Sequence, residues 1–240
     1  MNLRSDNLYK SVLIKISGEV LGGEAKRGFD PIVLSRIAKE IKRVHEMGIN
    51  VTIVVGGGNF WRGRYGSKEM DRTRSDHIGM LAIAMNSLAL CDAFEQEGIP
   101  TRVQTAIEMR QISEFYIRSR AIKHLEKGRV LIIGCGTGNP FFTTDSAAAL
   151  RAAELKVDAL LFAKNIDGVY DSDPAVNKDA IKFDEITFLE VLTRQLKVMD
   201  SNAICLCQDN NIPILVFDLN EKDSIVRAAS GEKIGTLIHN

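Results

Sequence analysis

The sequence lacks an excess of charge of either sign. Lys and Arg number 31, Asp and Glu also number 31, and the formal net charge is therefore zero. A protein that binds duplex nucleic acid usually carries a basic patch or stripe. The densest basic stretch, 117–129, is better interpreted as the solvated face of a helix. We therefore expect no nucleic acid among the partners of this protein.

The sequence also has few cysteines and no long apolar run. Its four cysteines have no metal-ligand spacing, which is typical of reduced thiols in a cytoplasmic protein. The first ten residues are polar and contain no apolar signal-peptide core. No uninterrupted apolar segment approaches the roughly 18 residues that would span a bilayer. We expect a cytoplasmic protein that has no membrane among its partners.

What the sequence does contain is a regular alternation of strand-like and helix-like segments. Hydrophobic residues make up 45% of the 240 residues. Asp30 and Pro31 suit the N-cap and first residue of one helix, and Gly48 suits its end. The fold class is therefore α/β, a single domain over residues 1–240 with a mostly parallel central sheet sandwiched between helices. The expected strands are 11–17, 50–59, 101–106, 129–134, 158–163, 213–218 and 236–239, and the expected helices are 31–47, 75–98, 118–127, 144–155, 187–195, 200–210 and 222–229.

Three of these strands end in unusual residues, at the edge where open α/β sheets bind ligands. The first strand contains Lys15 and ends at Ser17 and Gly18. A lysine inside an apolar strand is costly unless its ammonium group meets an anion. The alternative is a lysine at an edge of the sheet that extends into solvent. We favour an anion partner.

The second strand end carries three consecutive glycines at 56–58, followed by Asn59 and Arg62. Without side chains, the backbone N–H groups can approach an anion closely. The planar guanidinium of arginine suits phosphate oxygens. The alternative is a plain tight turn, and the added arginine favours phosphate binding.

The third strand end combines glycines with hydroxyl groups and a carboxylate at the start of a helix. Helix N-termini attract anions, although Thr and Asp are also ordinary N-caps. Neither a P-loop nor a complete G-x-G-x-x-G pattern is present. Together the three turns fit two phosphate groups that face each other better than a dinucleotide. The residues of this third turn are Gly134, Gly136, Gly138, Thr143, Thr144 and Asp145.

Segments along nearly the whole chain resemble the bacterial uridylate (UMP) kinases of the amino acid kinase family. The most specific is GTGNPFFTTD, and the others are KISGE, GGGNFWRG, DHIGMLAIAMN, DGVYDSDP, LKVMD and GTLI. The resemblance implies the amino acid kinase fold and the reaction ATP + UMP → ADP + UDP in pyrimidine nucleotide (CTP/UTP) biosynthesis. It also implies Mg²⁺ that arrives with ATP, an allosteric homohexamer, an acceptor-binding part at about 1–163 and an ATP-binding part at about 164–240.

The same resemblance implies a role for individual residues. Three are implied to be catalytic: Lys15 between the two phosphates, Arg62 on the opposite side, and Asp145, which holds either Lys15 or Mg²⁺ through water. No separate protein metal site is implied. The implied ATP-binding residues are Lys15, Ile16, Ser17, Gly18, Gly58, Arg62, Lys164, Tyr170 and Asp173. The implied UMP-binding residues are Gly57, Asp76 (on the ribose hydroxyls), Thr137, Gly138, Asn139, Pro140, Phe141, Phe142, Thr143 and Thr144.

The sequence departs from the family pattern in one loop and leaves one role open. Lys26 and Arg27 replace small and apolar residues in a loop, 22–29, that relatives use in activation by GTP, which argues against GTP as an activator. Lys164 either neutralises phosphate or flanks the adenine. UMP brings its own ionised nucleophile, so no general base is needed and His77 is interpreted as a packing residue.

Two other functions remain as alternatives. One is another kinase of this family, with a carboxylate or carbamate as acceptor; GTGNPFFTTD argues against it. The other is a nucleotide-binding regulator without catalysis. The presence of Lys15, Arg62 and Asp145 argues against a regulator, because a sensor does not need a set of charge-neutralising residues.

Overall fold

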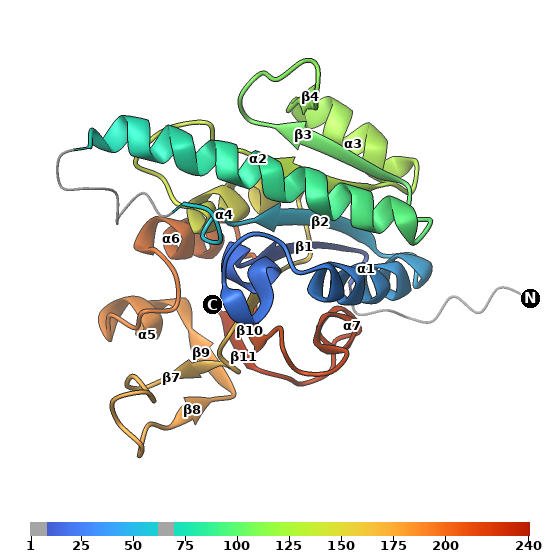
Figure 1. Ribbon diagram of the computed structural model, residues 1–240. Helices are drawn as coiled ribbons and strands as arrows, with labels where there is room; N and C mark the ends of the chain where they lie inside the picture. Colours follow the sequence, from blue (N-terminus) through green and yellow to red (C-terminus); the bar gives the residue numbers. More distant parts are fainter. Residues whose placement is uncertain (1–8, 62–69) are drawn as a thin grey trace, which may run out of the picture.

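The centre of the molecule is a nine-stranded sheet, seen in a computed structural model that describes residues 9–61 and 70–240 (Figure 1). The strands are β1 (Ser11–Ile16), β2 (Asn50–Val55), β3 (Thr101–Thr105), β4 (Glu114–Phe115), β5 (Val130–Gly134), β6 (Ala159–Lys164), β9 (Glu185–Thr187), β10 (Ile214–Asp218) and β11 (Thr236–His239). Their order is β4-β3-β5-β2-β1-β6-β10-β11-β9. All neighbours run parallel except β10 and β11, which confirms the predicted mostly parallel sheet.

Helices cover both faces of this sheet. They are α1 (Pro31–Glu46), α2 (Arg72–Gln96), α3 (Arg118–Glu126), α4 (Thr144–Leu155), α5 (Phe188–Thr193), α6 (Ser201–Asp209) and α7 (Ser224–Ala229). On one face α1, α2 and α7 pack over Val12, Ile14 and Ile16 of β1, and on the other α3, α4, α5 and α6 belong to the cluster of Leu13. Because side chains alternate along a strand, Lys15 falls on the same face as Leu13, the face that α4 covers.

The helix boundaries follow local capping chemistry. The carboxylate of Asp30 accepts hydrogen bonds from the N–H groups of Ile32 and Val33, which confirms the predicted start of α1. The start predicted for α2 at Ser75 is wrong by one turn, because Asp71 caps the helix and accepts from the N–H of Arg74. Asp71, four residues before Ser75, therefore starts the helix at Arg72 and extends it beyond its apolar stretch.

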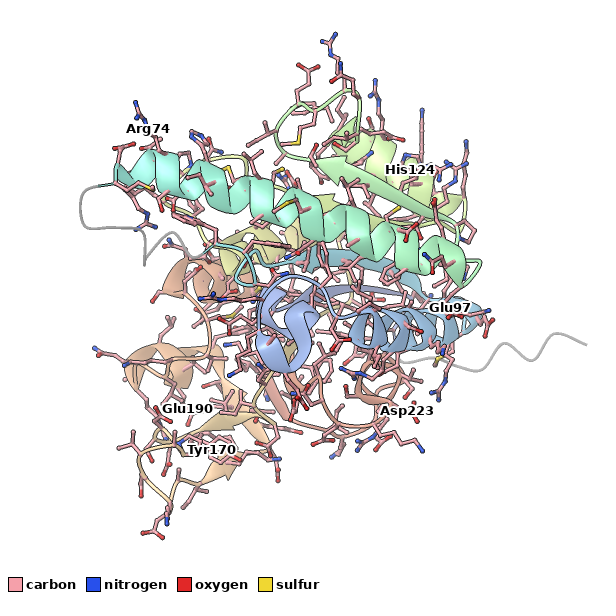
Figure 2. All side chains as sticks on the ribbon, in the orientation of Figure 1. Arg74, Glu97, His124, Tyr170, Glu190 and Asp223 are labelled. Atoms are coloured by element: carbon pink, nitrogen blue, oxygen red, sulfur yellow. The ribbon has the colours of Figure 1, made fainter. Side chains whose placement is uncertain are left out.

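Several short elements were not predicted. They are a 3₁₀ helix, η1 (Gly18–Ala25), the strands β4 and β9, and a separate hairpin formed by β7 (Val169–Tyr170) and β8 (Lys182–Phe183). The strands among them have only two or three residues and show no periodicity that a sequence pattern could reveal. Figure 2 places Tyr170 of this hairpin near Glu190 of α5, away from Arg74 and Glu97 at the two ends of α2.

Helix α2 carries apolar side chains both on the face that packs against the sheet and on its outer face. By length and composition it could cross a bilayer, but its buried residues, Leu90 and Phe94 among them, pack over the sheet as part of the core. A core helix of a globular domain has the same composition, so this helix alone does not indicate a membrane. Its outer face exposes Ile78 (37%), Leu81 (53%), Met85 (45%) and Leu88 (37%).

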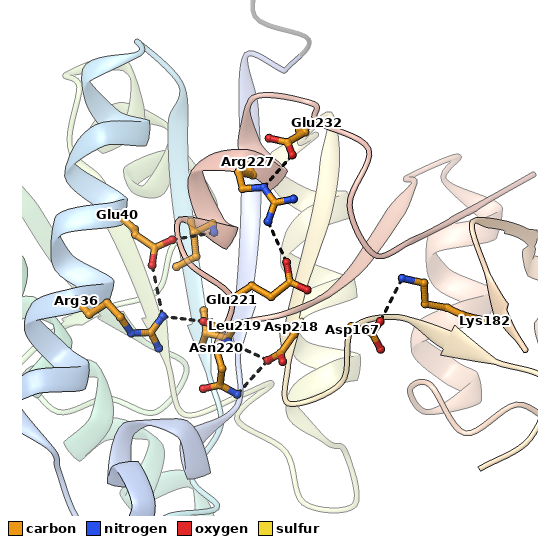
Figure 3. A network of polar contacts seen from close by, with 11 residues as sticks. Arg36, Glu40, Asp167, Lys182, Asp218, Leu219, Asn220, Glu221, Arg227 and Glu232 are labelled. Atoms are coloured by element: carbon orange, nitrogen blue, oxygen red, sulfur yellow. Dashed lines mark hydrogen bonds and ion pairs between the residues drawn. The ribbon is translucent and has the colours of Figure 1, made fainter. Parts of the chain in front are cut away.

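A polar network joins the first helix to the C-terminal segment (Figure 3). The buried carboxylate of Glu40 accepts from the N–H of Ile225 at 2.9 Å and from Arg36 at 3.4 Å. Arg36 also donates to the carbonyl of Leu219 at 2.7 Å. Burial raises the pKa of the Glu40 carboxyl, against the lowering effect of these partners. The network holds α7 and the end of β10 against α1.

Candidate active site

A cavity of about 1090 Å³ opens beyond the carboxyl ends of β1, β2, β5 and β6. All three glycine-containing turns singled out in the sequence contribute to its wall, so the expected meeting of these turns is confirmed. The predicted site residues that line it are Lys15, Ser17, Gly18, Gly57, Gly58, Asp76, Thr137, Asn139, Phe142, Thr143, Thr144, Asp145 and Lys164.

Lys15 and Asp145 form an ion pair within this cavity. The Lys15 Nζ lies 2.9 Å from Asp145 Oδ1, and Lys15 as a whole is 7% exposed. Strand β1 lies between β2 and β6, so Lys15 is not at an edge of the sheet and the solvent alternative is excluded. Its Nζ also lies 4.6 Å from the ring centroid of Phe162, the residue paired with it on β6. The ammonium group is thus held in place from two sides.

Lys164 at the end of β6 is a second lysine close to this ion pair. Its Nζ donates a hydrogen bond to the carbonyl of Val198. Burial lowers the pKa of Lys164, the charge of Asp145 opposes that effect, and the ammonium of Lys15 adds to it. The ammonium groups of Lys15 and Lys164 therefore share the charge of one carboxylate, that of Asp145, and repel each other. The negative charge of a bound phosphate would offset this repulsion.

A second cavity of about 410 Å³ adjoins the first. Tyr170 and Asp173 line it, and Lys164 and Val198 line both cavities. The hydroxyl of Tyr170 donates to Asp167 Oδ1 at 2.7 Å. The two cavities thus meet at Lys164, which places this lysine where two ligands would approach each other.

The glycine turns after β1 and β2 are in direct backbone contact. A Cβ atom on Gly18 would lie 2.4 Å from the carbonyl oxygen of Gly56 and 2.8 Å from the nitrogen of Gly58. The N–H groups of Phe60 and Trp61 both donate to the carbonyl of Gly57, so residues 56–61 do form a tight turn. That local role and a ligand-binding role are compatible, because Gly57 and Gly58 also line the cavity.

The turn after β5 leads into α4. Thr143 is the N-cap of that helix, and its hydroxyl accepts from the N–H groups of Asp145 and Ser146. The capping alternative is therefore correct for Thr143. It does not apply to Asp145, which lies in the first turn and pairs with Lys15. The carboxylate of Asp200, the N-cap of α6, accepts hydrogen bonds from the hydroxyls of Thr143 and Ser146.

Asp76 connects α2 to the third turn. Its carboxylate accepts from the backbone N–H of Phe141 at 2.8 Å and from Arg72 Nε at 2.9 Å. Phe141 has a φ of +71°, a left-handed conformation that is uncommon for a bulky residue. The guanidinium of Arg72 also lies 5.6 Å from the Phe141 ring centroid. The hydrogen bond from Phe141 to Asp76 therefore stabilises the turn in a conformation that phenylalanine does not favour.

Comparison with known proteins identifies the fold. The sequence model of the amino acid kinase family matches residues 10–218. The chain belongs to the amino acid kinase family. Among solved structures, it is similar to the UMP kinase from Bacillus anthracis, with 40% identity over 96% of each chain and a TM-score of 0.93.

Two further UMP kinase structures resemble this member of the amino acid kinase family. The enzyme from Ureaplasma parvum is 40% identical over 96% of this chain and 99% of its own, with a TM-score of 0.91. The uridylate kinase from Archaeoglobus fulgidus is 29% identical over 95% of this chain and 99% of its own, with a TM-score of 0.72. The implied amino acid kinase fold is thereby confirmed.

Some predicted site residues do not line the main cavity of this amino acid kinase. The side chain of Ile16 is buried in the core, and its carbonyl accepts a hydrogen bond from the N–H of Gly56. Gly138 packs against Ala106 with a φ of +80°. Pro140 and Phe141 lie outside the cavity wall, and the prediction for Arg62 falls outside the described residues.

Sequence reasoning missed several residues that line the cavity, among them Trp61, Arg72 and Asp200. Trp61 lies inside the GGGNFWRG segment and Asp200 ends the LKVMD segment, but neither was assigned a role, and Arg72 precedes the DHIGMLAIAMN segment. The indole N–H of Trp61 donates to the hydroxyl of Ser75 at 3.1 Å. Arg72 precedes Asp76 by four residues, a helical ion-pair spacing that could have revealed it.

Proposed function

We propose that this protein transfers the γ-phosphoryl group of ATP to UMP, giving ADP and UDP for pyrimidine nucleotide biosynthesis. The observation that carries the proposal is the junction of two cavities at Lys164, beside the ion pair of Lys15 and Asp145. The likeness to structures described as UMP kinases, at 40% identity over nearly the whole chain, supports UMP as the acceptor.

In the proposed reaction a phosphate oxygen of UMP attacks the γ-phosphorus of ATP, and the bond from that phosphorus to the bridging oxygen of ADP breaks. The attacking oxygen is already ionised at neutral pH, so no residue has to remove a proton. Such transfers depend mainly on positioning and charge stabilisation. Lys15 and Lys164 supply positive charge at the junction, and Asp145 orients Lys15. Arg62 is proposed to bind phosphate from the opposite side.

The two substrates are proposed to occupy different parts of the chain. UMP lies in the acceptor-binding part, about 1–163, against Gly57, Asp76 and the turn at 137–144. ATP lies against the ATP-binding part, about 164–240, with Tyr170 and Asp173 beside its adenine and ribose and with the turn 15–18 and Gly58 on its phosphates. The smaller cavity around Tyr170 has room for the adenine and ribose.

We also propose that Mg²⁺ enters the site with ATP. Within residues 9–61 and 70–240, no group of three or more His, Cys, Asp or Glu side chains is placed to hold a metal ion by itself. Magnesium is commonly held by one or two carboxylates together with substrate phosphates. Asp145 and Asp200 line the main cavity and fit that donor set. The ion would neutralise charge on the phosphates during transfer.

A coupled assay with ATP, Mg²⁺ and a panel of acceptors tests this function. We expect ADP release with UMP to exceed that with CMP, dUMP or AMP, and UDP to form in equal amount. Turnover with a carboxylate or carbamate acceptor instead would support a different kinase of the family. Binding of UMP and ATP without formation of UDP would support a regulator without catalysis.

Replacing Asp76 should mainly weaken UMP binding. Asp76→Ala removes the proposed ribose acceptor, and loss of a hydrogen bond to a charged group costs about 1.5–3 kcal/mol, so we expect the KM for UMP to rise roughly 10- to 100-fold. The KM for ATP should change little. Steady-state kinetics with each substrate varied in turn measure both values. Asp92→Ala, on an exposed part of the same helix, is the matched control, and an unchanged KM for UMP would remove Asp76 from the ribose site.

We propose that the protein is an allosteric, cytoplasmic homohexamer that associates through the outer face of α2. Ile78, Leu81, Met85 and Leu88 recur there at helical spacing and are more than one-third exposed. Leu81→Glu should lower the molar mass measured by light scattering, because it buries a charge in the interface. Leu189→Glu, at an exposed leucine of α5, should leave the mass unchanged. An unchanged mass for Leu81→Glu would exclude this face.

A further inference from the structure

Two buried asparagines behind the triple-glycine turn form a reciprocal pair. Asn86 of α2 donates from Nδ2 to Asn59 Oδ1 at 2.7 Å, and Asn59 donates from Nδ2 to Asn86 Oδ1 at 2.9 Å. Asn86 is fully buried and Asn59 is 3% exposed. Buried amides are costly unless their donors and acceptors are satisfied, and here each amide satisfies the other.

The remaining donors of the pair bind backbone carbonyls on either side. Asn86 Nδ2 donates to the carbonyl of Gly56 at 2.6 Å, and Asn59 Nδ2 donates to the carbonyl of Gly28 at 2.8 Å. The pair thus ties together the turn after β2, the centre of α2 and the segment that precedes α1. Neither side chain lines the cavity.

The Gly56 carbonyl, which accepts from Asn86, lies between the turn at 17–18 and the turn at 56–58. The oxygen of Gly56 would lie 2.4 Å from a Cβ on Gly18, so it already packs against the turn that follows Lys15. Helix α2 also backs the next residue, because a Cβ on Gly57 would lie 2.9 Å from the carbonyl oxygen of Gly79. A displacement of the Gly56 carbonyl would therefore move Gly18 as well as Gly57 and Gly58.

We propose that Asn86, together with Asn59, is a positioning residue for phosphoryl transfer. The pair fixes the spacing between the turns at 17–18 and 56–58, whose backbones line the cavity, and so holds their N–H groups where phosphate oxygens arrive. This inference rests on the proposed function. A misplacement of reacting groups by about 1 Å can lower a rate about 10²-fold, which is the scale expected if the spacing relaxes.

The test compares Asn86→Ala, Asn59→Ala and the double variant with the wild type. We expect kcat to fall between about 10- and 100-fold in each single variant. The double variant should lose little more than the worse single variant, because the two amides act as one unit. Ser87→Ala is the matched control, since its buried hydroxyl lies beside Gly134 and donates to the carbonyl of Ile83 within α2, not to a carbonyl of the turns at 17–18 or 56–58. It should retain the wild-type kcat.

The kinetic comparison separates positioning from stability and from the proposed reaction. If the asparagine variants melt at lower temperature but keep kcat within twofold of an active wild type, the pair is structural only and the inference is overturned. Strictly additive losses of kcat would also contradict a single unit. If Asn86→Ala does not fold, Asn59→Ala at the edge of the network carries the test. A wild type that makes no UDP would instead refute the proposed function.

Discussion

Replacing Lys15 by alanine is expected to lower kcat by roughly 10²- to 10³-fold or more while the fold remains intact. Loss of one preorganised group that stabilises charge in the transition state has effects on this scale. Lys15 meets that description, because Asp145 at 2.9 Å and the ring of Phe162 hold its ammonium in the cavity before any ligand arrives. Single-turnover measurements with saturating ATP and UMP would isolate the chemical step.

A matched control distinguishes this effect from a general loss of positive charge. Lys10→Ala removes an exposed lysine that directly precedes the same strand, and it should leave kcat unchanged. Circular dichroism and thermal unfolding of Lys15→Ala should show the native fold, because the removed ammonium group lines the cavity and is not part of the hydrophobic core. Near-normal turnover in a folded Lys15→Ala enzyme would show that the catalytic role of Lys15 is wrong.

The second large effect is expected for Gly18→Ala. A methyl group at this position would lie 2.4 Å from the carbonyl oxygen of Gly56 and 2.8 Å from the nitrogen of Gly58. Both are backbone atoms, so the two turns must separate. Overpacking of this kind typically costs about 1–3 kcal/mol in stability. Because the displaced turns line the cavity, kcat/KM should fall on the order of 10²-fold, which steady-state kinetics would measure.

A different glycine separates lost stability from lost catalysis. Gly128 has a φ of +67° and open space around it, so Gly128→Ala strains the backbone without a steric clash. It precedes β5 at the end opposite to the cavity. We expect it to lower the free energy of unfolding by about 1 kcal/mol and to leave kcat/KM unchanged. If Gly18→Ala retained full kcat/KM, the close contact of the two turns would have no catalytic importance.

Much of the fold could be predicted because its signals are local. The strand at 50–55 and the helix at 31–46 follow from apolar periodicity, and Asp30 identifies the start of the helix by satisfying free N–H groups. The hairpin of β7 and β8 could not be predicted in this way, because two-residue strands show no period. The helix start at Arg72 was missed for another reason, since Asp71 lies outside the apolar pattern that guided the prediction.

The candidate site was predicted to a similar extent and for a similar reason. Glycine turns at strand ends are visible in the chain itself, and they converge because parallel strands end at the same edge of the sheet. Asp200 and Arg72 were not assigned, because an N-cap or a helix residue gains a role only from what it faces. Asn86 was missed since nothing in an apolar helix reveals which side chain meets a neighbouring turn.

The order of residues along the chain was enough to establish an α/β sheet, capped helices and glycine-rich turns gathered at one edge. The sequence signals of these features lie in residues a few positions apart along the chain. The pairing of Lys15 with Asp145 and of Asn59 with Asn86 was decided only by the folded arrangement. The physical reason is that β1 lies in the interior of the sheet, where the alternation of side chains directs Lys15 towards α4 on one face. Helix α2 lies on the other face, where it supports the turn at 56–58.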